Sequence, residues 1–144
     1  MRYPTPAFAV LAAIGLAIPT LIAVAPAAAA APTTRAAPAV QPYNQAAFEA
    51  AQRAGKPILV WVHAKWCPVC REQAKTIARV TAAPAYRDMQ VFRIDFDTQR
   101  PMWQRFGATM QSTLIAYRGR RETARIAHDT NEARVSAVIS SAVV

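Results

Sequence analysis

Residues 57–70 read PILVWVHAKWCPVC, and this stretch decides the fold. Its first seven residues are apolar apart from His63 and rich in β-branched side chains, which is typical of a strand buried on both faces. Cys67 and Cys70 follow closely and are the only cysteines of the chain, and residues 71–83 continue in a helical pattern. A strand that leads into C-x-x-C at the first turn of a helix is the geometry that a dithiol–disulfide switch requires. The sequence therefore predicts redox chemistry at sulfur, with metal binding as the main alternative.

The first part of the chain has the composition of an export signal followed by a linker. Residues 1–31 combine Arg2, a long apolar stretch and an alanine-rich end with small-x-small cleavage sites, which predicts a cleaved signal peptide. A retained membrane anchor is the alternative, which Pro19 and the alanine-rich end disfavour. Residues 32–42 are rich in proline and alanine and are predicted to be a semi-extended linker. One domain remains, residues 43–144, and we expect it to be periplasmic or secreted.

The charge of the chain is +9, from 17 Lys and Arg residues against 8 Asp and Glu residues. The arginines are spread along the domain rather than clustered among aromatic residues, so the sequence does not indicate a nucleic-acid-binding protein. Export places the two cysteines in an oxidising compartment, where one structural disulfide could form. However, a bridge across C-x-x-C closes a very short loop and would stabilise the fold little. The pair is therefore interpreted as reactive.

The domain alternates between helical and strand patterns. Helices are predicted over residues 43–54, 67–83 and 99–106, with a last helix capped by Thr130 and Asn131, and strands over 57–63, 91–95, 112–117 and 122–127. The inner faces of the second and last helices are assigned to Ala74, Ile77, Ala78, Val80, Ala133, Val135, Val138 and Ile139. Crossover helices make the first two strands parallel, and the last two strands form a hairpin. The predicted fold is α/β, a mixed four-stranded sheet with helices on both faces.

With these elements in order, the chain resembles the thioredoxin family over about residues 43–142. The resemblance rests on W-C-x-x-C at residues 66–70 after its strand, on residues 93–97 and on residues 106–119. It implies a thioredoxin-like fold and an exported thiol–disulfide oxidoreductase that reduces or exchanges disulfides of envelope proteins. The expected partners are protein thiol or disulfide substrates and a membrane electron donor or acceptor. No cofactor, metal or nucleic acid is expected, and the protein is expected to be a monomer.

We expect the residues in and around the motif to have distinct roles. Cys67 at the helix N-cap would face free N–H groups and the positive end of the helix dipole, which favour the attacking thiolate. Cys70, one turn later, would resolve the mixed disulfide. Trp66 is expected to shield Cys67 and to offer a flat docking surface, and Ser112 and Thr113 are expected to bind the substrate.

Two positions depart from the family pattern. Ser112 stands where the family usually has a cis-proline, and Trp61 stands where it often has a buried aspartate beneath the second cysteine. Because a cis bond before a non-proline residue costs about 3–4 kcal/mol, we expect this loop to be trans or rearranged.

The missing proline keeps other functions open. Without it, the space beside Cys67 could admit a soft ion such as Cu(I), held by Cys67, Cys70 and a third ligand such as His63. The alternative function is thus a copper-binding or redox-sensing module without turnover. A further alternative is a structural relic of the fold that binds a partner.

Overall fold

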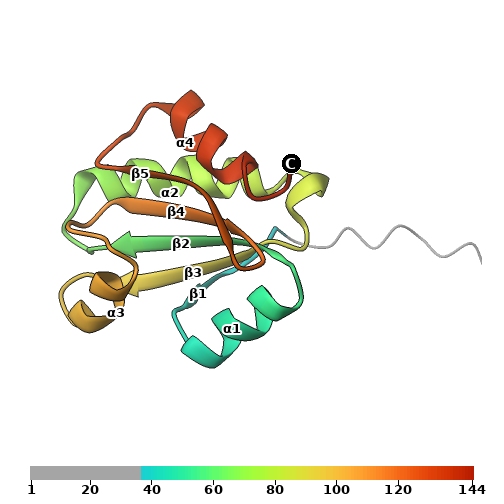
Figure 1. Cartoon of the computed structure of the whole chain (residues 1–144). Coiled ribbons are helices and arrows are strands. Elements are labelled where there is room, and N and C mark those ends of the chain that lie inside the picture. The colour runs from blue at the N-terminus through green and yellow to red at the C-terminus, as the bar shows by residue number, and fades with distance from the viewer. Residues whose placement is uncertain (1–36) are drawn as a thin grey trace, which may run out of the picture. The chain divides into compact units, whose positions relative to one another are not determined.

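The computed structural model describes residues 37–144, and a mixed five-stranded sheet runs through this part of the chain (Figure 1). Its strands follow the spatial order β1-β3-β2-β4-β5. The bounds are Val40–Pro42 for β1, Pro57–His63 for β2, Gln90–Asp95 for β3, Thr113–Arg118 for β4 and Arg121–Ala127 for β5. β1, β3 and β2 are parallel, whereas β4 is antiparallel to β2 and to β5.

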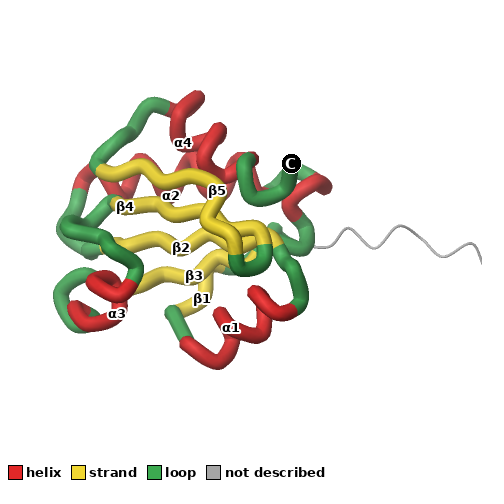
Figure 2. The backbone as a smooth tube through the Cα atoms, in the orientation of Figure 1, coloured by secondary structure: helices red, strands yellow, loops and turns green. Residues whose placement is uncertain are grey.

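Helices cover both faces of the sheet. Their bounds are Gln45–Arg53 for α1, Pro68–Thr81 for α2, Arg100–Arg105 for α3 and Glu132–Ser140 for α4, and a 3₁₀ turn, η1, spans Pro84–Tyr86. Figure 2 shows α2 and α4 on one side of the strands and α1 and α3 on the other. Two buried apolar clusters match this division, and both cysteines belong to the cluster beneath α2 and α4.

The central strand β2 explains why both faces need helices. Leu59 and Trp61 pack into the cluster beneath α2 and α4, whereas Ile58, Val60 and Val62 pack into the cluster beneath α1 and α3. Each of the five side chains is at most 3% exposed. Burying a side chain of this kind contributes about 1.5–3 kcal/mol, so β2 anchors the whole sheet. The bounds of this strand, 57–63, were predicted correctly from its apolar run.

The α/β class is confirmed, but the predicted number of strands is wrong. The fifth strand, β1, pairs with the edge of β3, with Val40 opposite Val91 and Pro42 opposite Arg93. It lies inside residues 32–42, where the sequence predicted a linker. A proline is tolerated in an edge strand because its missing N–H costs no central ladder bond, and this explains why the proline-rich composition hid the strand.

The predicted helix N-caps agree with the structure, whereas the predicted inner faces of the helices agree only in part. Asn44 caps α1 through the Ala47 N–H, and Asn131, rather than Thr130, caps α4 through the Arg134 N–H. Ala78 and Ala133, assigned to inner faces, are exposed. On α2 the buried positions include the polar residue Gln73, which is fully buried.

The predicted signal peptide, residues 1–31, lies outside the described residues. Within residues 37–144, no helix has both the length and the apolar character needed to cross a membrane.

Candidate active site

Cys67 occupies the position that a dithiol nucleophile needs, at the N-cap of α2. Its backbone is extended, with φ −79° and ψ 115°, and its sulfur accepts a hydrogen bond of 3.1 Å from the Cys70 N–H. Pro68 follows at the first helical position, where a missing N–H costs no helical hydrogen bond. The sulfur therefore lies among the free amides and at the positive end of the helix.

The two thiols differ in acidity. Burial alone would raise the pKa of Cys67, but hydrogen bonds from the Cys70 thiol, the Ser112 hydroxyl and the amides of Cys70 and Val69 outweigh it and lower this pKa. Burial raises the pKa of Cys70, and its hydrogen bond to the Cys67 sulfur raises it further. Cys67 is thus the thiol that ionises first and can attack, while Cys70 stays protonated to a higher pH.

Both cysteines are reduced and almost completely buried, with Cys67 1% and Cys70 0% exposed. Their neighbours are not all apolar, since the amide-rich helix end and Ser112 surround the Cys67 sulfur. A substrate sulfur can therefore reach Cys67 only if the groups that cover it move.

Ser112 faces Cys67 from the loop before β4. Its Oγ lies 3.6 Å from the Cys67 Sγ, and the residue is fully buried. No cis peptide bond occurs within residues 37–144, which agrees with the expectation of a trans loop. Instead, Ser112 adopts a left-handed backbone with φ +58° and donates its N–H to the Val62 carbonyl at 2.8 Å. Its own peptide groups are thus satisfied inside the protein, and the hydroxyl is the group that it presents to the sulfur.

The other two predicted substrate-binding residues lie differently. Trp66 is 57% exposed beside Cys67, and its indole N–H donates to the Asp97 carboxylate at 3.1 and 3.2 Å. This exposure fits a docking surface rather than a core residue. Thr113 is 4% exposed and donates its hydroxyl to the Met110 carbonyl at 2.8 Å, so its side chain fixes the loop.

Gln73 is a site residue that the sequence analysis did not identify. Its Oε1 accepts from the Trp61 indole N–H at 3.0 Å, and its Nε2 donates to the carbonyls of Ser112 at 2.9 Å and Asp129 at 3.0 Å. Its spacing was an available signal, because a residue three positions after Cys70 lies on the same helix face. The usual placement of glutamine in solvent points the other way.

The structure does not bring His63 into a metal site. His63 is half-buried and its ring packs edge-on against Trp61, with 4.6 Å between ring centroids. No group of three His, Cys, Asp or Glu side chains suited to a metal is present within residues 37–144. The copper-binding alternative therefore lacks the third ligand that the sequence suggested for it.

The family model described as Thioredoxin matches residues 39–141. The chain belongs to the thioredoxin family.

The chain is also similar to individual proteins. The chain is 44% identical to Trxlp from Edwardsiella tarda EIB202, whose crystal structure aligns with a TM-score of 0.67 over 70% of this chain and 98% of that one. A thioredoxin from Malassezia sympodialis shares the fold at 17% identity, with a TM-score of 0.64 over 74% of this chain and 93% of that one. The soluble secreted antigen MPT53 of Mycobacterium tuberculosis H37Rv is 26% identical over 122 residues, covering 66% of this chain and 70% of the relative.

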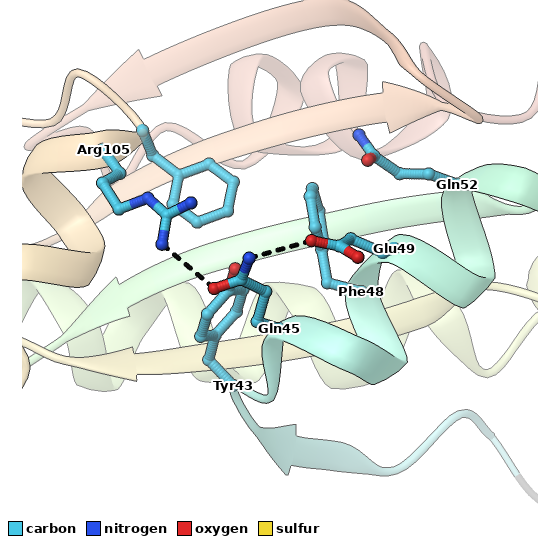
Figure 3. A pocket seen from close by; sticks show the side chains of 7 residues that line it. Tyr43, Gln45, Phe48, Glu49, Gln52 and Arg105 are labelled. Carbon is cyan, nitrogen blue, oxygen red and sulfur yellow. Dashed lines mark hydrogen bonds between the residues drawn. The ribbon is translucent and has the colours of Figure 1, made fainter.

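A hollow of about 240 Å³ lies on the face of this thioredoxin-like domain that is remote from the cysteines (Figure 3). Its lining residues come from α1, α3 and their flanks: Tyr43, Gln45, Phe48, Glu49, Gln52, Arg105 and Phe106. Arg105 donates to Gln45 at 3.0 Å, and Gln45 donates to Glu49 at 2.9 Å. Gln45 thus joins the charged groups of Arg105 and Glu49 across the hollow.

The pKa difference between the cysteines predicts two separate titrations in the reduced protein. Iodoacetamide should alkylate Cys67 with a midpoint below the ordinary value of a thiol, because a lowered pKa keeps the thiolate present until the pH falls through it. Cys70 should react with a midpoint above that value, because its pKa is raised. Fragment-ion mass spectrometry of the peptide that carries both cysteines separates the two rates. A midpoint for Cys67 at or above that of Cys70 would contradict this assignment.

Proposed function

We propose that this thioredoxin-family protein is an exported thiol–disulfide oxidoreductase that reduces or exchanges disulfides of envelope proteins. The observation that carries the proposal is the Cys67 sulfur, which accepts the Cys70 amide at 3.1 Å at the N-cap of α2, with the second thiol one turn later. Family membership supports the reaction class. The signal peptide predicted over residues 1–31 supports export to the periplasm or beyond, as does the description of the relative MPT53 as secreted.

The reaction follows from the order in which the thiols ionise. The Cys67 thiolate attacks one sulfur of the substrate disulfide, which breaks the S–S bond, and the departing sulfur takes up a proton. Cys70 then loses its proton and attacks the Cys67 sulfur of the mixed disulfide, releasing the second substrate thiol. Two electrons pass to the substrate, and the protein is left with a Cys67–Cys70 disulfide. A membrane electron donor protein would restore the dithiol, and an acceptor would drive the reverse reaction.

The substrate would bind beside the buried pair rather than in a deep pocket. The exposed indole of Trp66 offers an apolar plane next to Cys67, held in place by Asp97. Ser112 and Thr113 would contribute from the loop before β4, because the serine hydroxyl faces the reacting sulfur and the threonine fixes the loop. We propose that the protein acts as a monomer.

Trapping of a mixed disulfide tests the proposed order of attack. In the variant Cys70→Ser, Cys67 can still attack oxidised insulin, but the resolving thiol is absent. We therefore expect the variant to accumulate a covalent adduct with an insulin chain, which mass spectrometry detects and dithiothreitol releases.

The double variant Cys67→Ser/Cys70→Ser is the matched control and should form no adduct. An adduct on Cys67→Ser that is absent from Cys70→Ser would reverse the two roles. A wild-type protein that exchanges with neither insulin nor glutathione disulfide would refute the proposed function.

A further inference from the structure

A chain of largely buried hydrogen bonds, centred three residues after Cys70, connects β2, α2 and two loops. The Gln73 side chain stands at its centre and is fully buried. It accepts from Trp61 on β2 and donates to the carbonyls of Ser112 and Asp129, so one side chain joins the loop before β4 to the loop before α4. Both amide protons of Gln73 are used, and its oxygen is held by the indole.

Two residues in the loops joined by these hydrogen bonds have unusual backbone conformations. Ser112 has φ +58° and His128 has φ +51°. Residues other than glycine are uncommon in this left-handed region. Such residues persist when the surrounding structure determines their conformation. The His128 N–H donates to the Ser112 carbonyl at 3.2 Å, and Gln73 donates to the same carbonyl at 2.9 Å. Two donors therefore fix the orientation of the Ser112 peptide.

This orientation decides where the Ser112 hydroxyl points. With the carbonyl held toward α2 and the N–H bound to Val62, the side chain projects toward Cys67, and Oγ lies 3.6 Å from the sulfur. If the main chain of Ser112 left this left-handed conformation, its Cα and Cβ would shift and the hydroxyl would no longer be held beside the sulfur. The hydroxyl can donate to the Cys67 thiolate and thereby favours its charged form.

We propose that Trp61 and Gln73 are a positioning pair that holds the Ser112 hydroxyl against the Cys67 sulfur. This inference rests on the proposed function, because it assigns the pair a role in preparing the attacking thiolate. Gln73 supplies the two donors for the loop carbonyls, and Trp61 fixes the orientation of the amide so that its NH₂ group faces them. A glutamate at this position would keep the acceptor for Trp61 but lose the two donors.

The neighbouring ionisable groups do not take over this role. The Asp129 carboxylate bonds to Arg134 at 2.8 Å and accepts the Asn131 N–H at 2.7 Å, while only its backbone carbonyl meets Gln73. Burial and Arg93 lower the pKa of His63, the ring that packs on Trp61, so His63 is neutral where a thiol titrates. Cys70 is the titratable group that acts directly on Cys67.

The test measures the pKa of Cys67 by iodoacetamide alkylation in the absence of any disulfide substrate. Ser112→Ala should raise this pKa by about half to one unit, which gives roughly three- to tenfold less thiolate at low pH. Gln73→Met should produce a similar rise, and Trp61→Phe should produce a smaller rise in the same direction. In the Ser112→Ala background, neither substitution should raise the pKa further, because the hydroxyl through which the pair acts is already absent.

Thr81→Val is the matched control. It removes another buried hydrogen bond of α2, from Thr81 to the Ile77 carbonyl at 2.8 Å, without touching the loop. It should lower stability and leave the pKa of Cys67 unchanged.

Two results would overturn the inference. One is an unchanged pKa in folded Gln73→Met, or in Trp61→Phe if the first variant does not fold. The other is a rise that persists undiminished in the Ser112→Ala background. Neither result would affect the proposed disulfide exchange, which the insulin experiments test separately.

Discussion

Replacing Cys67 by serine is expected to abolish disulfide reduction. A serine hydroxyl does not ionise near neutral pH, and Cys70 is a poor substitute because burial raises its pKa, so little of it is thiolate at that pH. The rate of insulin reduction by dithiothreitol should fall at least about a hundredfold, to the rate without protein. Insulin turbidity measured at pH 7 gives this comparison directly.

Cys70→Ser supplies the contrast for this experiment. It should also lose turnover, but it should retain the single attack by Cys67 and hence the trapped insulin adduct. Circular dichroism of both variants checks that the fold is intact. Substantial activity in Cys67→Ser would mean that Cys70 is the attacking thiol and that the N-cap position of Cys67 has no catalytic consequence.

Replacing Ser112 by proline is expected to destabilise the protein, although proline is the residue that the family usually carries at this position. Proline requires φ near −65°, whereas Ser112 has φ +58°, and proline lacks the N–H that Ser112 donates to Val62 at 2.8 Å. The free energy of unfolding should fall by about 3 kcal/mol or more. For a domain of roughly 100 residues this corresponds to a Tm lower by about 12 °C or more. Thermal and urea unfolding of the reduced proteins measure both quantities.

Ser112→Ala separates the backbone effect from the loss of the hydroxyl. Alanine keeps the N–H and tolerates the same backbone about as well as serine, so its unfolding free energy should remain within about 1 kcal/mol of wild type. If Ser112→Pro were as stable as wild type, the loop would have another accessible conformation, and the anchoring by Gln73 would not determine its shape.

The elements around the motif could be predicted because their signals are local. The apolar run of β2, the turn into Cys67 and the proline at the first helical position all lie within residues 57–70. The N-cap roles of Asn44 and Asn131 are local in the same way. In contrast, β1 is stabilised by pairing with β3, about 50 residues later in the chain, and nothing within its three residues indicates that partner.

The parts of the site that escaped prediction depend on contacts between distant segments. Gln73 is buried because Trp61, Ser112 and Asp129 provide partners for each of its polar atoms, and such partners are visible only after folding. The left-handed backbone of Ser112 is likewise imposed by those contacts rather than by the serine itself. The sequence could indicate that the usual proline was missing, but not what replaces its function.

The two edges of the sheet restrict how a polypeptide can attach to this molecule. On one side, β1 offers only three residues and ends in Pro42, which cannot donate a backbone hydrogen bond. On the other, β5 carries the charged residues Arg121, Glu122 and Arg125. Edge strands that are short, contain proline or carry charged side chains disfavour pairing with a strand from another chain. A partner therefore gains little by extending the sheet. Under the proposed function, a substrate instead docks at the surface around Trp66, where it also meets the thiols.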